Sequence, residues 1–418
     1  IPRDLCGWRS RHRDPMKRLL LSVLFVHQLA AMFAQGDTIP VTPDTTKLNM
    51  DAVYGRPFQQ LGGGSIALGG YVEANTRYSN TDGISEGLSF QLPRLTLFIS
   101  SSITRRIKFL TEIELEEGGK EINIEFASID LALHPMLNLR GGVLMNPIGA
   151  FNQNHDGPKW EFVDRPIAST TIIPATWSNV GFGLYGKTAR GAWVYAYEAY
   201  LTNGFDGSIV DNAQGRTWLP AAKANSERFE ESSNGVPLVT LKGAIKHRRY
   251  GELGLSWMGG VYNRFQEDGL KLDVRRRVDL LAIDYTARFG THGPAITAEH
   301  VWAMVDVPDT YTQQYGRAQR GGFVDFVQAI VRKPVFGWKD ACVNLALRAE
   351  YVDYNVGTFN ETGGNIADEL VAITGGIGFR PASGTVLRAN YGYEWQRDLL
   401  GNPASRTAKV LVGVSSYF

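Results

Sequence analysis

The sequence predicts an all-β fold, a closed antiparallel transmembrane β-barrel of sixteen strands, from three observations. After Ser65 the chain falls into runs of alternating apolar and polar residues, each roughly 8 to 13 residues long, which is the length that a tilted strand needs to cross a bilayer. The connections between these runs alternate between long and short. The final run, Lys409 to Phe418, places Val410, Val412 and Val414 on one face and stops on an aromatic residue, a pattern typical of membrane barrels.

Composition by itself resembles that of a soluble protein, with 418 residues, 44% hydrophobic residues and a mean hydropathy of −0.17. A membrane barrel has such a composition because each strand shows lipid only at every second residue. The two cysteines are Cys6 and Cys342, and Cys6 lies in the leader described next. A single remaining thiol excludes a disulfide framework and a cysteine metal site.

The N-terminal part is expected to be a leader. Met16-Lys17-Arg18, the apolar run Leu19 to Phe33 and an alanine-rich exit are typical of a secretory signal peptide, with a one-helix membrane anchor as the alternative. The expected organisation is 1–15 non-native upstream sequence, 16–34 signal peptide, 35–64 periplasmic segment and 65–418 barrel. Residues 1–34 hold six basic and two acidic residues, so without them the net charge changes from +1 to −3. This balance predicts no nucleic-acid partner.

The expected strands follow the period-two runs and are 66–78, 89–102, 106–117, 121–133, 137–145, 179–186, 192–202, 238–247, 252–262, 277–288, 294–305, 322–332, 341–354, 369–379, 385–396 and 407–418. Every odd-numbered connection, beginning with 79–88, is long except 118–120, and no even-numbered one exceeds eight residues. Outer-membrane barrels combine short periplasmic turns with long external loops. A soluble β-sandwich, the alternative, has no reason to keep its long loops at one end.

Alternation within single strands predicts which face meets lipid. In 192–202, Trp193, Tyr195 and Leu201 share one face, while Glu198 and Tyr200 lie on the other. Strand 385–396 divides in the same way. We expect the aromatic faces to contact outer-membrane lipid and the charged faces to line a water-filled interior, because sixteen strands enclose more space than side chains can fill.

A long insert interrupts the strand pattern between Asn146 and Ser178. Loops of this length in a compact fold are usually functional or disordered, and this one carries Phe151, Trp160, Trp177 and four prolines, which argues against disorder. Its charged residues have both signs, which suits a wet environment. We therefore expect this third external loop to fold inward into the barrel; an ordinary surface loop of a soluble β-protein is the alternative.

The same stretch carries a family resemblance. NPIG, NHDGPKWEFVDRP and PATWSNVGFGLYG resemble the constriction-loop region of the phosphate-selective porin O and P family, and the resemblance extends from about Gly69 to Phe418. It implies a sixteen-stranded outer-membrane barrel, a homotrimer and an inward third loop. We expect small residues of the first strand, Gly69, Gly70 and Ala74, to face lipid, where they would suit packing against a neighbouring subunit.

Two sets of residues are the expected functional sites. The constriction-loop set is His155, Asp156, Lys159, Glu161, Asp164 and Arg165, and the pore-lining set is Arg77, Arg94, Arg140, Lys242, Arg288, Arg348 and Arg388. Acids and bases are equally frequent on the inner face, so the residues themselves do not predict the sustained basic ladder that a phosphate path needs. Arg165 either lines the path or pins the loop to an acidic wall residue.

No catalytic or metal-ligand pattern is present. Outside the leader the histidines are scattered over separate runs, at His134, His155, His247, His292 and His300. We expect no enzyme activity, cofactor or metal. The predicted function is passive diffusion of small hydrophilic solutes or ions, with anions such as phosphate as candidates, across a bacterial outer membrane. The alternative is a barrel that serves as a surface-exposed binding or structural protein.

Overall fold

A computed structural model describes residues 47–53, 55–60, 65–290, 293–308, 317–359 and 362–418. The predicted upstream sequence and signal peptide, and much of the predicted segment 35–64, lie outside these residues. The chain divides into two compact units, 1–43 and 44–418, and everything that follows concerns the second. Among the described residues, no helix combines the length and apolarity needed to span a membrane.

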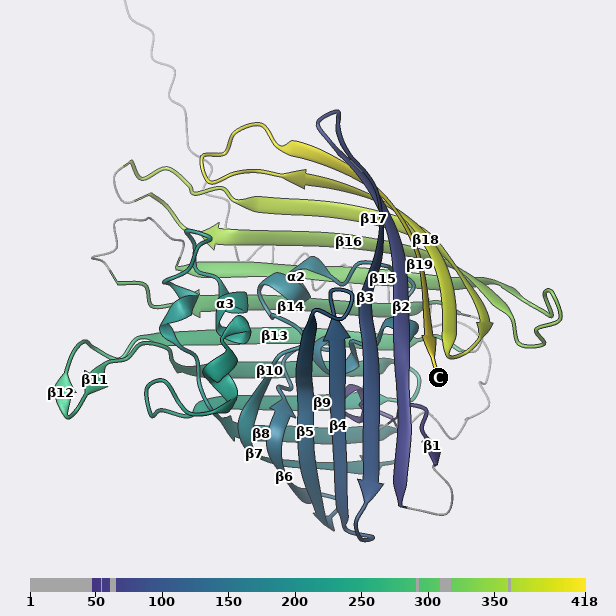
Figure 1. Cartoon of the computed structure of the whole chain (residues 1–418), viewed down its shortest axis with the longest axis horizontal. Coiled ribbons are helices and arrows are strands. Elements are labelled where there is room, and N and C mark those ends of the chain that lie inside the picture. The colour runs from purple at the N-terminus through teal and green to yellow at the C-terminus, as the bar shows by residue number, and fades with distance from the viewer. Residues whose placement is uncertain (1–46, 54, 61–64, 291–292, 309–316, 360–361) are drawn as a thin grey trace, which may run out of the picture. The chain divides into compact units, whose positions relative to one another are not determined.

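Sixteen antiparallel strands form a closed barrel in which each strand pairs with its neighbours in sequence (Figure 1). They are β2 (Ile66–Thr81), β3 (Ile84–Ser102), β4 (Ile107–Glu116), β5 (Glu121–His134), β6 (Leu137–Met145), β7 (Ser178–Arg190), β8 (Trp193–Thr202), β9 (Leu238–His247), β10 (Gly251–Val261), β13 (Arg277–Arg288), β14 (Ala295–Val305), β15 (Ala318–Arg332), β16 (Cys342–Val356), β17 (Glu369–Ala382), β18 (Thr385–Gln396) and β19 (Ser405–Tyr417). Closure comes from β19, which pairs with β2 from Tyr417↔Tyr71 to Thr407↔Thr81. The predicted sixteen-stranded antiparallel barrel is confirmed.

The first connection differs from the prediction. Instead of a loop over 79–88, β2 and β3 continue to a two-residue turn, Asp82–Gly83, with φ of 50° and 90°. Asp-Gly is the sequence signal for a type I′ hairpin turn, whose two central residues both need positive φ. The prediction of a loop over 79–88 rested on the alternation of apolar and polar residues and did not take this turn signal into account. A second Asp-Gly pair, Asp268–Gly269, joins β11 (Gln266–Glu267) and β12 (Leu270–Lys271) within the predicted loop 263–276.

The predicted division of strand 192–202 into two faces is confirmed. In β8, Trp193 and Leu201 are 39% and 56% exposed, whereas Glu198 and Tyr200 are buried. The prediction that Gly69 faces lipid is wrong. Gly69 shares the inner face of β2 with Glu73, and a Cβ on Gly69 would lie 2.4 Å from the carbonyl oxygen of Pro57. One residue of error in register exchanges the two faces of a strand. Ala74 keeps an exposed outer position, whereas Gly70 is buried beneath the Phe418 ring, which would lie 2.5 Å from a Cβ on Gly70.

A buried apolar cluster packs two long connections against the wall. It joins Ile148, Ile172, Trp177 and Phe205 to Leu280 and other residues of β10, β13 and β14. Two short helices belong to these connections, α2 (Ile167–Thr171) and α3 (Leu219–Ala224). The apolar residues of these strands therefore mark where the two long connections pack against them.

Candidate functional site

Residues 146–177, here the inserted loop, connect β6 to β7 through η3 (Asn152–Asn154), η4 (Gly157–Lys159) and α2. Its two ends are tied together. The Asn146 amide donates to the Trp177 carbonyl at 3.0 Å, and the Asn152 side chain accepts from the Trp177 amide at 2.7 Å. Asn152 and Trp177 are each only 1% exposed, so the loop closes on itself before it meets the wall.

The start of the inserted loop, together with Ser169 of α2, is held by β9, β10 and β14. The Glu299 carboxylate accepts from the amides of Ala150 (2.7 Å) and Phe151 (3.0 Å) and from the Ser169 hydroxyl (2.6 Å). Lys242 donates to the Gly149 carbonyl at 2.5 Å. Hydrogen bonds that involve a charged group are stronger than those between neutral groups. These contacts therefore hold the beginning of the loop in a fixed position on the wall.

The middle of the inserted loop is held by three arginines of the opposite wall. Arg348 of β16 donates to the Asp164 carbonyl (2.8 Å), and Arg388 of β18 donates to the carbonyls of Gly157 (3.1 Å) and Trp160 (3.0 Å). Arg380 of β17 binds the Glu161 carboxylate at 2.5 Å. A guanidinium presents five donors in a rigid fork, which suits it to fixing irregular backbone.

Asp156 is fully buried against a cation from outside the inserted loop. Arg56 contacts Asp156 at 2.5 Å and Glu112 of β4 at 2.9 Å, and all three side chains are inaccessible to solvent. Burial favours the neutral acid, but the adjacent Arg56 guanidinium outweighs it and holds the pKa of Asp156 well below its usual range. The carboxylate therefore stays charged at neutral and mildly acidic pH.

This depressed pKa predicts a pH dependence. A carboxylate whose pKa is lower in the folded state contributes its stability above the unfolded pKa of about 3.9 and loses it as pH falls from there through the folded pKa. We expect the stability difference between the wild type and Asp156→Asn to stay constant from pH 8 to about 5 and to shrink only in stronger acid. Urea unfolding at each pH measures this difference. A difference that disappears by pH 6 would contradict the charged pair.

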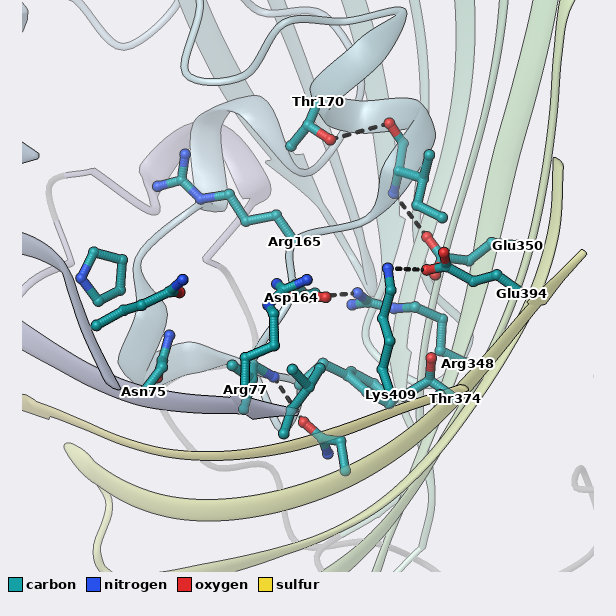
Figure 2. A pocket seen from close by; sticks show the side chains of 18 of the residues that line it. Asn75, Arg77, Asp164, Arg165, Thr170, Arg348, Glu350, Thr374, Glu394 and Lys409 are labelled. Carbon is teal, nitrogen blue, oxygen red and sulfur yellow. Dashed lines mark hydrogen bonds and ion pairs between the residues drawn. The ribbon is translucent and has the colours of Figure 1, made fainter. Parts of the chain in front are cut away.

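A cavity of about 450 Å³ remains between the inserted loop and the strands β2, β3 and β16 to β19 (Figure 2). Its charged lining residues are Arg77, Arg94, Asp164, Arg165, Arg348, Glu350, Glu394 and Lys409. Two ion pairs cross or border it, Arg77 with Asp164 and Lys409 with Glu394, both at 2.5 Å. Bases outnumber acids on its surface by five to three.

Arg165 lines this cavity without a close partner. Figure 2 shows its side chain extending away from the Arg77–Asp164 pair, and its nearest acidic atom is Glu114 Oε1 at 4.0 Å. Within the described residues its Nη2 has no hydrogen-bond acceptor. Wall residues such as Glu299, Lys242 and Arg388, rather than Arg165, form the hydrogen bonds that hold the loop.

The structure brings only part of the predicted sets to the cavity. Asp164, Arg165, Arg77, Arg94 and Arg348 line it. The other predicted residues do not line the cavity. In the constriction-loop set, His155, Asp156 and Glu161 are buried, and Lys159 binds Asp156 and the Ala52 carbonyl. In the pore-lining set, Arg140 binds Asp130, Lys242 binds Asp284, Arg388 binds Glu73, and Arg288 lies at the short-turn end of β13. Loop packing uses these wall charges, which a strand pattern cannot show.

Arg56 and Arg380 were missed by sequence reasoning. Arg56 lies in an aperiodic stretch before the first strand, and Arg380 lies one residue beyond the predicted end of its strand. Arg56-Pro57 was the available signal for the first, because a residue before proline is restricted to extended backbone and presents its side chain from a defined position.

Two clusters of acidic or histidine side chains have the spacing of metal ligands, Glu112 with His155 and Asp156, and Glu114 with Glu116 and Glu125. Arg56 already bridges the first. Arg94 lies 3.2 Å from Glu114 and 3.7 Å from Glu116 in the second. Cationic side chains thus occupy the positions from which a metal would be bound, and the expectation of no metal remains a prediction.

Comparison with known proteins supports the fold. No family model matches the chain. An uncharacterized protein of Aquifex aeolicus (strain VF5) is 39% identical over 217 residues, a match that covers 50% of this chain and 46% of that protein, so the chain spans about half the length of the relative.

Solved structures with similar folds are porins and channels. Salmonella typhi OmpF, solved with daunomycin, has 11% identity and a TM-score of 0.54 over 87% of this chain and 100% of its own. The anion-selective porin of Comamonas acidovorans has 14% identity and a TM-score of 0.51 over 85% and 99%. The channel DcaP of Acinetobacter baumannii has 12% identity and a TM-score of 0.50 over 86% and 99%. The fold is that of an outer-membrane porin, and the O and P family remains a resemblance.

Proposed function

We propose that the protein is a passive diffusion porin of a bacterial outer membrane, through which small hydrophilic solutes or ions cross in water. The observation that carries this proposal is the charged cavity beside the inserted loop, inside a closed sixteen-stranded barrel. A barrel of this size leaves an aqueous interior, and its exposed outer residues suit lipid. The short turns then lie in the periplasm and the long connections outside.

The proposal includes an inward third loop that forms the constriction. Its support is that side chains from strands on opposite sides of the barrel bind the same loop, Glu299 of β14, Glu198 of β8 and Arg388 of β18 among them. A loop lying over the outer surface could not reach all three. Single-channel recording in planar bilayers tests the function: discrete conductance steps support the porin, whereas a sealed bilayer at saturating protein would leave the surface-binding or structural alternative.

The excess of bases over acids in the cavity supports a preference for small anions, among which phosphate is one candidate. We expect Arg165→Glu to lower the anion-to-cation permeability ratio on the order of fivefold, because one charge at about 4 Å contributes about 1 kcal/mol even in water. Reversal potentials in a salt gradient measure it, and Arg264→Glu, whose side chain is 64% exposed on a long connection, is the control. If both variants shift equally, the cavity is not the path.

We further propose a homotrimer, supported by the small, exposed residue Ala74 on the outer face of β2. The leader over 16–34 and the upstream sequence 1–15 also remain proposals. Migration as a trimer on an unheated gel, together with a trimer mass by light scattering in detergent, is the expected result. A monomer in both measurements would remove the trimer and leave the channel untouched.

A further inference from the structure

A segment that precedes the barrel crosses the interior wall of its short-turn end. Residues 47–53 and 55–60, here the strap, begin beside β9 and β10, where the Asn49 amide donates to both carboxylate oxygens of Glu252 (3.1 and 3.0 Å). Lys187 of β7 binds Asp51 at 2.6 Å. The strap ends at β1 (Gln59–Gln60), which pairs with β2 (Figure 1). It therefore spans the lumen wall from β10 back to β2.

Arg56 is the centre of the strap. Its side chain has no solvent exposure, forms ion pairs with Glu112 and Asp156, and lies 4.0 Å from the ring centre of Phe98. One partner belongs to the barrel wall and the other to the inserted loop. Buried charges of this kind are strongly destabilising when one partner is removed. Arg56 thus joins strap, wall and loop in one contact.

Further contacts seat the strap on both surfaces. Lys159 of the inserted loop donates to the Ala52 carbonyl at 3.2 Å. Val53 packs with Leu110, Phe126 and Met145 in a buried apolar cluster. At the far end, the Pro57 carbonyl oxygen lies 2.4 Å from the position that a Cβ on residue 69 would take. The strap can therefore pack against β2 only because residue 69 is a glycine.

We propose that the strap is a built-in occluding element of the pore. It closes the part of the lumen bordered by β4 to β13 and positions the inserted loop through Arg56, so that solutes pass only through the charged cavity beside β2, β3 and β16 to β19. This inference rests on the proposed porin function. Arg56 is a positioning residue, since it lies outside the residues that line the cavity.

Two variants test the strap from opposite ends. Arg56→Ala removes the cation shared by Glu112 and Asp156 and leaves Asp156 with Lys159 alone. Gly69→Ala places a methyl group against the Pro57 carbonyl. We expect both to raise single-channel conductance roughly twofold, because a second path opens beside the first, and to increase gating noise. Arg56→Lys keeps the charge but loses the fork and is expected to be intermediate. Arg105→Ala, an exposed arginine on a short turn, is the control.

A second measurement does not depend on conduction. In a Cys342→Ser background, Met50→Cys places a thiol in the strap at a position that is 8% exposed. We expect slow reaction with a charged thiol reagent, accelerated on the order of a hundredfold by Arg56→Ala because the broken ion pair releases the strap. Arg105→Ala is expected to leave the rate unchanged.

The outcomes separate the two proposals. Conduction by the wild type, with larger conductance in both strap variants and faster labelling in Arg56→Ala, supports the strap. Conduction with unchanged conductance in both variants, or with unchanged labelling in Arg56→Ala, overturns it and leaves the porin standing. If neither the wild type nor any variant conducts, the porin proposal fails, and the labelling rate of Met50→Cys alone tests whether Arg56 holds the strap against the wall. Faster labelling in Arg56→Ala supports this role of Arg56, and an unchanged rate overturns it.

Discussion

Arg348→Met is expected to destabilise the barrel by about 3–5 kcal/mol, because it leaves a buried carboxylate without its cation. Arg348 donates from Nε and Nη2 to the two oxygens of Asp325, each at 2.7 Å, and the two side chains are 2% and 3% exposed. The same guanidinium holds the Asp164 carbonyl of the inserted loop. Urea unfolding in detergent, followed by the gel mobility of the folded barrel, measures the loss.

A double variant and a surface pair make this prediction specific. Arg348→Met/Asp325→Leu removes both buried charges and is expected to recover most of the lost stability, as replacement of a whole buried pair often does. Arg277→Met removes the cation of a pair whose side chains are 51% and 27% exposed, and is expected to cost less than about 1 kcal/mol. Equal losses in Arg348→Met and Arg277→Met would show that burial of the first pair is not what matters.

Trp177→Ala is expected to cost about 3–5 kcal/mol, the range for truncating a fully buried aromatic side chain. Trp177 is 1% exposed, packs 5.4 Å from the Phe205 ring, and belongs to the apolar cluster that joins the two long connections to the wall. Its backbone amide also donates a hydrogen bond to the Asn152 side chain, which joins the two ends of the inserted loop. The cavity left by truncation therefore lies where the loop is anchored.

The matched control is Trp338→Ala, at a tryptophan that is 48% exposed on a short turn, and its expected cost is under about 1 kcal/mol. Unfolding by urea measures both variants, and channel recording is expected to show noisier current in Trp177→Ala alone. A Trp177→Ala barrel as stable and quiet as Trp338→Ala would mean that the inserted loop is not held by this cluster.

The sequence by itself determined the barrel. Alternation at period two assigns each strand two faces, and consecutive strands of the antiparallel sheet are neighbours, so strand number, order and the outward-facing residues follow from local pattern. Trp193 and Leu201 were placed correctly for that reason. Where local pattern was misread, at Asp82–Gly83 and at Gly69, the errors were a missed turn signal and a face error of one residue.

Only the tertiary structure decided which inner charges border the cavity with an accessible side chain. Arg77, Arg388 and Lys242 belong to the same predicted pore-lining set, yet Arg77 borders the cavity with 32% of its side chain exposed, while the other two are buried against the backbone of a loop far away in sequence. Arg56, from a stretch without any period, became the partner of Asp156 a hundred residues later. Periodicity reports the face of a residue, whereas its partner depends on how irregular segments fold across the barrel, and those contacts leave no repeat in the chain.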